Sequence, residues 1–112
     1  MHEVGLMQTA LELALEQARR QGARQVHRLG LRVGPLAGAD PEALALAFEV
    51  VVRSTAAEGA ELSLEATPLL CRCGCGHDFE AGDVFRECPR CGRPGAPVRS
   101  GAGLELAYIE VS

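Results

Sequence analysis

Residues 71–92 read CRCGCGHDFEAGDVFRECPRCG and contain all five cysteines of the 112-residue chain. The CPRCG stretch at 88–92 is typical of one half of a zinc ribbon, because two thiolates three positions apart can bind one ion and the following glycine permits a positive φ. An odd number of cysteines, without the basic and apolar segments of a secretory signal, favours metal binding in a reducing compartment over a disulfide framework. We therefore expect a zinc site in a cytoplasmic protein.

The set of zinc ligands has one open position. Cys75 is followed by a glycine in the same way as Cys91, so Cys75, Cys88 and Cys91 are expected ligands. The fourth ligand is either Cys73, which forms a tight C-x-C pair with Cys75, or Cys71, which forms a more relaxed C-x3-C pair. Four thiolates complete a tetrahedron and leave no position for a substrate or a catalytic water, so we expect a structural zinc ion.

The sequence on both sides of the cysteine-rich stretch alternates between helical and extended patterns. Asp40-Pro41-Glu42 is a strong helix start, with an N-cap acid, a proline at the first helical position and an acid near the positive end of the helix dipole. Apolar periodicity predicts helices over 4–21 and from 41 to about 55, and strands over 28–34, 61–66 and 104–111. We expect an α+β fold, a three-stranded sheet with two helices plus an inserted zinc-ribbon subdomain at 69–100.

Composition excludes several classes of function. The net charge is −4, and all 11 basic residues are arginines, so the lysine-containing phosphate-binding loop is absent. An acidic chain is a poor candidate for binding nucleic acid, and its apolar runs fall far short of the ~20 residues that a membrane helix needs. No nucleophile elbow, catalytic carboxylate pair or dinucleotide-binding glycine motif is present, and we expect no enzyme activity.

The chain begins Met1-His2-Glu3, which is a potential site for a transition metal. The α-amino group of Met1, the backbone nitrogen of His2 and the His2 imidazole can close two fused chelate rings around one ion. Because the backbone nitrogen must lose its proton, such a site suits Ni(II) or Cu(II), which favour planar nitrogen donors.

Over essentially its whole length the chain resembles the hydrogenase nickel-incorporation family HypA, with its HybF paralogues. The resemblance rests on Met1-His2-Glu3 at the start, GADPEAL at 38–44, AEGAEL at 57–62, the late cysteine-rich insert and the closing segment 104–111. It implies a nickel metallochaperone that acts in the maturation of nickel–iron hydrogenase. It also implies as partners the GTPase HypB, the hydrogenase large-subunit precursor and, in some organisms, urease maturation proteins, but neither nucleic acid nor a membrane.

The resemblance also implies the roles of particular residues. Ni(II) would bind at His2 with the Met1 amine and Glu3, and Asp40 matches a family position proposed near the nickel. Residues 1–68 and 101–112 would form the nickel-binding domain. The first cysteine pair is one residue shorter than the C-x-x-C usual in the family, and the family register favours Cys73 over Cys71. Gly5 departs from the larger residues that the family has there.

Two further hypotheses remain at this point. The chain could instead be a zinc-ribbon interaction module that binds nucleic acid or a larger enzyme, with an incidental amino terminus. Within the metallochaperone hypothesis, His77 is a candidate to exchange into the zinc shell as the pH varies, because it adjoins the first cysteine pair. Such an exchange would couple the two metal sites through a tilt of the ribbon.

Overall fold

A computed structural model describes residues 2–112, so the predicted role of the Met1 amine lies outside the described residues. The chain divides into two compact units. The first comprises the chain up to Arg32 together with Ala39–Glu65 and Leu104–Ser112, and the second comprises Val33–Gly38 and Ala66–Gly103. Neither helix in residues 2–112 has the length and apolar character needed to cross a membrane.

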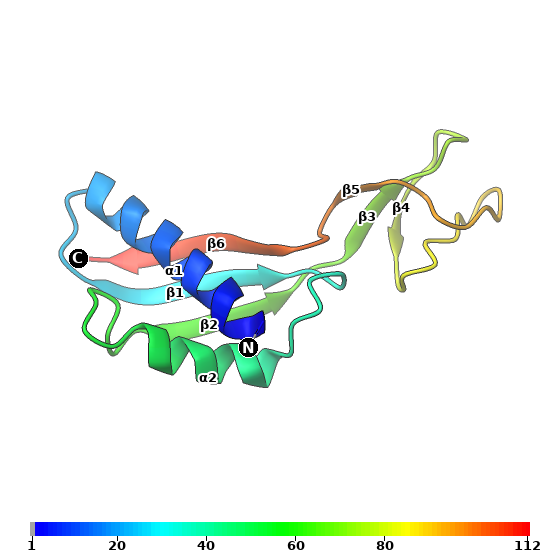
Figure 1. Cartoon of the computed structure of the whole chain (residues 1–112). Helices are drawn as coiled ribbons and strands as arrows, with labels where there is room; N and C mark the ends of the chain where they lie inside the picture. Colours follow the sequence, from blue (N-terminus) through cyan, green and yellow to red (C-terminus); the bar gives the residue numbers. More distant parts are fainter. Residues whose placement is uncertain (1) are drawn as a thin grey trace. The chain divides into compact units, whose positions relative to one another are not determined.

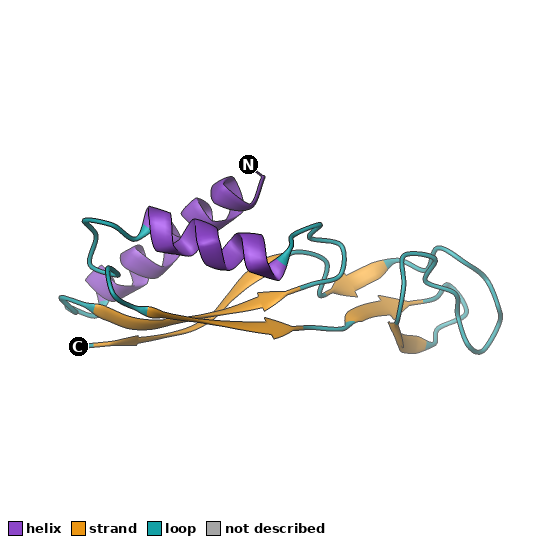
Figure 2. Ribbon diagram, turned by 90° about the horizontal axis from the view of Figure 1, so that it is seen from below, coloured by secondary structure: helices purple, strands orange, loops and turns teal. Residues whose placement is uncertain are grey.

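The first unit packs two helices on one face of a three-stranded sheet (Figures 1 and 2). Its elements are α1 (His2–Arg20), β1 (Val26–Val33), α2 (Pro41–Val51), β2 (Glu61–Ala66) and β6 (Leu104–Val111), with strand order β2-β1-β6. Large apolar side chains from both helices and the central strand are buried together: Met7, Leu11, Leu29, Leu31, Leu44 and Phe48. The predicted α+β architecture is confirmed.

The first helix ends where the sequence predicts. Gly22 has a φ of 71°, and its N–H donates to the carbonyl oxygen of Arg19 at 3.0 Å. The N–H of Ala23 donates to the carbonyl oxygen of Ala18 at 2.9 Å. These two bonds form a Schellman motif, in which the left-handed position favours glycine.

The second helix begins as predicted and ends earlier. Asp40 is its N-cap and Pro41 its first residue, but the Asp40 side chain makes no capping hydrogen bond. The helix stops at Val51 and not near Thr55. The hydroxyl of Thr55 donates to the carbonyl oxygen of Val52 at 2.6 Å and so satisfies an acceptor at the helix end.

The uncovered face of the first sheet carries a close contact between an aromatic ring and a glycine. The Tyr108 ring lies directly against Gly30, where any side chain larger than hydrogen would overlap it. Beside this contact Arg28 pairs with Glu61 at 2.7 Å and with Glu110 at 3.8 Å. The φ of Gly30 is not positive, so backbone conformation does not require a glycine at this position. Close packing against the Tyr108 ring does.

The second unit contains another three-stranded sheet, which the sequence analysis did not predict. Its strands are β3 (Leu69–Arg72), β4 (Asp78–Ala81) and β5 (Val98–Ser100), in the order β4-β3-β5 with both pairings antiparallel. The segment 33–38, which the sequence analysis placed in the other domain, packs with this unit. Here the N–H of Gly34 donates to the carbonyl oxygen of Gly103 at 2.9 Å, and that of Thr67 to Val33 at 3.1 Å.

Candidate metal centres

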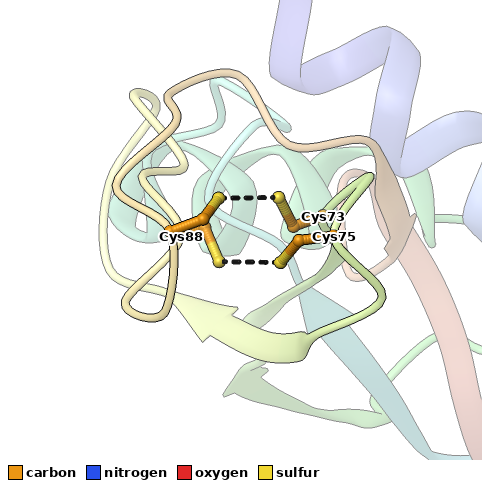
Figure 3. A group of neighbouring side chains, drawn as sticks. Cys73, Cys75 and Cys88 are labelled. Atoms are coloured by element: carbon orange, nitrogen blue, oxygen red, sulfur yellow. Dashed lines mark hydrogen bonds between the residues drawn. The ribbon is translucent and has the colours of Figure 1, made fainter.

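Four cysteine side chains converge in the second unit. The Sγ atoms of Cys73, Cys75, Cys88 and Cys91 all lie within 4.8 Å of one another. Cys73 and Cys91 are 3.3 Å apart and Cys75 and Cys88 are 3.8 Å apart; Figure 3 shows Cys73 and Cys75 facing Cys88. A tetrahedral zinc with Zn–S bonds of about 2.3 Å has sulfur–sulfur edges of about 3.8 Å. The four sulfur atoms therefore fit around one zinc ion.

Each cysteine pair sits on a tight turn that ends in a glycine. In the first turn the N–H of Gly76 donates to the carbonyl oxygen of Cys73 at 2.9 Å, and in the second the N–H of Gly92 donates to that of Cys88 at 2.8 Å. Gly76 and Gly92 have φ values of 94° and 76°, which L side chains rarely adopt. The first turn is one residue shorter, yet it still presents both of its sulfur atoms to the same point.

The fifth cysteine, Cys71, is not one of the four cysteines that converge. Cys71 lies inside β3, opposite Phe79 on β4 and Val98 on β5, and is 1% exposed. Its side chain belongs to a small core with Leu69 and Ala81, which also includes Cys73 and Cys88. Cys73 lies one residue beyond the end of β3, where its side chain can turn toward the other sulfurs.

The metal-free thiols do not titrate alike. The backbone N–H of Cys75 acts to lower the pKa of Cys73, but hydrogen bonding with Cys91 and burial outweigh it and raise that pKa to about 11. Burial acts to raise the pKa of Cys88, but the backbone N–H groups of Cys91 and Arg90 outweigh it and lower that pKa to about 7. Of these two thiols, Cys88 is thus the more readily ionised to the thiolate that binds metal.

His77 does not join the sulfur group. Its ring stacks beside Phe79, with ring centroids 6.1 Å apart and an interplanar angle of 12°, while its carbonyl oxygen accepts from the N–H of Cys73 at 2.9 Å. Among residues 2–112 the four cysteines form the one group of at least three potential ligands. The proposed exchange of His77 into the zinc shell remains a prediction.

The predicted nickel residues lie at the start of α1. His2 is 55% exposed, and its Nδ1 is 3.7 Å from a carboxylate oxygen of Glu3. The same Glu3 carboxylate accepts a hydrogen bond of 3.4 Å from the backbone N–H of Asp40. The backbone N–H of Glu3 itself and that of Asp40 hold the pKa of Glu3 below its usual value of 4.5. Asp40 is thus joined to Glu3 through its backbone, and its carboxylate does not form a three-ligand group with His2 and Glu3.

Comparison with known proteins identifies the family. A profile described as "Hydrogenase/urease nickel incorporation, metallochaperone, hypA" matches residues 1–111. The chain belongs to the HypA family. Curated relatives named "Hydrogenase maturation factor HypA" from Picosynechococcus sp. and Acidithiobacillus ferrooxidans are each 40% identical over 112 residues, covering 99% of both chains. A HypA factor from Geobacter metallireducens is 37% identical at the same coverage.

Solved HypA structures share the fold. The solution structure of the nickel metallochaperone HypA from Helicobacter pylori matches with a TM-score of 0.79 at 22% identity, covering 99% of this chain and 97% of that one. A second solution structure of a HypA protein matches with a TM-score of 0.75 at 21% identity. At this sequence identity the similarity shows a shared fold.

Sequence reasoning did not predict the contact between Glu3, at the start of α1, and Asp40, the N-cap of α2. The Glu3–Asp40 hydrogen bond uses a backbone donor, for which residue type gives no signal. The uncapped Asp40 side chain was also unexpected, because an N-cap acid usually accepts from the first turn of its own helix.

Proposed function

We propose that this chain is a metallochaperone that binds Ni(II) at its amino terminus and delivers it during the maturation of nickel–iron hydrogenase. The observation that carries the proposal is the exposed His2 imidazole beside an ionised Glu3 carboxylate, at the end of a chain of the HypA family. Nickel is the cargo, and the chain itself catalyses no reaction.

The residues at the start of α1 would contribute different groups to nickel binding. The His2 imidazole and backbone nitrogen, with the Met1 amine, supply nitrogen donors that suit Ni(II) over Zn(II). The Glu3 carboxylate adds negative charge beside them, and the Asp40 N–H fixes its position. Asp40 thus has a positioning role through its backbone N–H.

Exposure of the site favours release of the ion. The His2 side chain is 55% exposed, so an incoming ligand from an acceptor protein can reach the metal without unfolding the unit. We infer that the acceptor is the hydrogenase large-subunit precursor, that the GTPase HypB is a second partner, and that urease maturation proteins are served in some organisms.

The four thiolates supply a separate, structural site. Zinc bound by Cys73, Cys75, Cys88 and Cys91 would be fully coordinated, leaving no position for substrate. Its contribution is to hold the two turns together in a unit with few large apolar side chains, where metal binding is coupled to folding. The zinc ribbon would thus lie in the second unit, Val33–Gly38 with Ala66–Gly103, and the nickel residues in the first.

Calorimetric titration of untagged zinc-loaded protein with Ni(II) tests the nickel site. One ion should bind to the original chain, and His2→Ala should weaken binding about 100-fold or more, because an imidazole donor is lost from a chelate. His27→Ala is the matched control, since His27 is exposed on β1 and bonds only to the Ser112 hydroxyl, at 2.7 Å, among the described residues.

An amino-terminal extension gives a second test of the same site. Added residues convert the Met1 amine into an amide, which removes one donor while leaving His2 in place. Nickel affinity should fall as it does in His2→Ala. Equal affinity in the original chain, the extended chain and His2→Ala would place the nickel elsewhere.

A further inference from the structure

The outer side of α2 exposes large apolar residues. Leu46 is 67% exposed and Val50 is 55% exposed, and they lie one helical turn apart. With Val4 and Ala43 they line an open groove of about 260 Å³ between α1 and α2, and Glu3 lies on its wall. Below we call this the α1/α2 groove.

The surroundings of the α1/α2 groove are acidic. Exposed Glu42 and Glu49 lie on α2, which contains no arginine. Along α1 the first arginine is Arg19, in the last turn and far along the helix from Val4. Exposed Arg53 lies two residues past the end of α2, and the other ten basic residues lie outside α2 and outside the first four turns of α1. Glu3 is the acidic residue in the groove lining, and Glu42 and Glu49 lie on α2 outside that lining. Acidic residues thus outnumber the one nearby arginine around an apolar floor.

This combination disfavours a second copy of the chain as occupant. In a symmetric dimer the same surface meets itself, so the groove acid Glu3 and the nearby Glu42 and Glu49 of both copies would be brought to one contact. Like charges at a desolvated border oppose association. A helix with an apolar ridge and basic flanks meets both features of the groove, because apolar side chains at i and i+4 fill a channel between two helices.

We propose that the α1/α2 groove binds an amphipathic helix of a partner protein that has an apolar ridge flanked by lysine or arginine. The proposal deepens the proposed function and rests on it for its purpose: Glu3 forms part of the groove wall, so a helix bound there lies beside the nickel residues. Docking would bring the partner's own metal ligands within reach of His2.

Binding of two synthetic helical peptides to the full-length zinc-loaded protein tests the proposal. The first peptide carries a leucine ridge with lysine flanks, and the second has glutamate in place of each lysine. Fluorescence anisotropy should detect salt-sensitive binding of the lysine peptide and about tenfold weaker binding of the glutamate peptide. Leu46→Asp should weaken binding of the lysine peptide about tenfold or more, and the uncharged Leu46→Ser should weaken it in the same direction.

Leu13→Asp is the matched control. Leu13 is 54% exposed on α1 and lines a different groove, against β6, so this variant should change peptide affinity by no more than about twofold. Glu49→Arg should weaken binding of the lysine peptide and make that binding less dependent on salt concentration. Equal binding by Leu46→Asp and Leu13→Asp, or equal binding of the two peptides, would overturn the proposal.

Two measurements on the same variants separate the proposal from its alternatives. Sedimentation should find the original chain and Leu46→Asp in the same association state, whereas a dimer lost in Leu46→Asp would make a second copy the occupant and overturn the proposal. Nickel titration should give Leu46→Asp the affinity of the original chain. If the original chain binds nickel but binds the lysine and glutamate peptides equally, the groove proposal is wrong and the proposed function stands. If the original chain does not bind nickel, the proposed function is wrong.

Discussion

Replacing Cys71 or Cys73 by alanine should separate a core thiol from a metal ligand. The two cysteines are two residues apart, so both can point to the same side of the chain as it leaves β3. Cys71 is enclosed between β4 and β5, whereas the Sγ of Cys73 is 3.3 Å from that of Cys91. We expect Cys71→Ala to keep zinc and Cys73→Ala to lose affinity for it.

The two losses differ in kind and size. Cys71→Ala removes one buried heavy atom, which costs about 1–2 kcal/mol of unfolding free energy through lost burial and a small cavity. Structural zinc sites bind with roughly 10–16 kcal/mol, so an equal share for each of four ligands corresponds to about two to three orders of magnitude in affinity. Cys73→Ala should therefore weaken zinc binding about 100- to 1000-fold.

Competition with a chromophoric chelator measures both variants on one scale. Thermal unfolding of the zinc-loaded forms should show a modest loss for Cys71→Ala and a large, chelator-dependent loss for Cys73→Ala. The reasoning is refuted if Cys71→Ala loses zinc as Cys73→Ala does, or if Cys73→Ala retains the original affinity.

Three other predictions follow from the packing and the thiol pKa values. Gly30→Ala should lower the unfolding free energy by about 1–3 kcal/mol, because the new methyl group overlaps the Tyr108 ring, and Tyr108→Ser should relieve most of this loss in thermal denaturation. Gly34→Ala should cost more, since its methyl group meets a backbone carbonyl that no side-chain change can move; equal melting temperatures for the two variants would contradict this. Zinc affinity should decrease as the pH is lowered, because Cys73, with a pKa of about 11, must release a proton to bind zinc both above and below pH 7. The decrease should be steeper below about pH 7, where Cys88 also holds a proton that zinc must displace. Competition titrations on either side of pH 7 should show the change of slope.

The first unit was largely predictable because its signals are local. Asp40-Pro41 marks the start of α2, Gly22 ends α1 in a left-handed turn, and alternation over 61–66 gives the bounds of β2. The early end of α2 was not predictable from apolar periodicity. The pattern continues through Val52, whereas the chain leaves the helical path at Ser54, whose φ is 62°, and the Thr55 hydroxyl donates to the carbonyl oxygen of Val52.

The second unit was less predictable because its signals are short and mixed. Its strands have only three or four residues, and their inward positions include Cys71, so an apolar alternation is visible only once a cysteine is counted as a core residue. Spacing alone also left both Cys71 and Cys73 open as the fourth ligand, with the more relaxed pair formed by Cys71, and the family resemblance favoured Cys73. The pairing of β3 on both sides distinguishes them, and that pairing depends on β5, which lies far along the sequence.

The assignment of residues 33–38 to the second unit bears on how the protein can be dissected. A fragment that starts after β2 and stops before β6 is contiguous in sequence, yet it omits Gly34, whose N–H bonds to Gly103. Such a fragment would expose the surface that this segment covers and would melt at a lower temperature than the same region in the intact chain. Excised ribbons therefore understate the native stability of their metal site, and permuted chains that retain this segment are the better reagents.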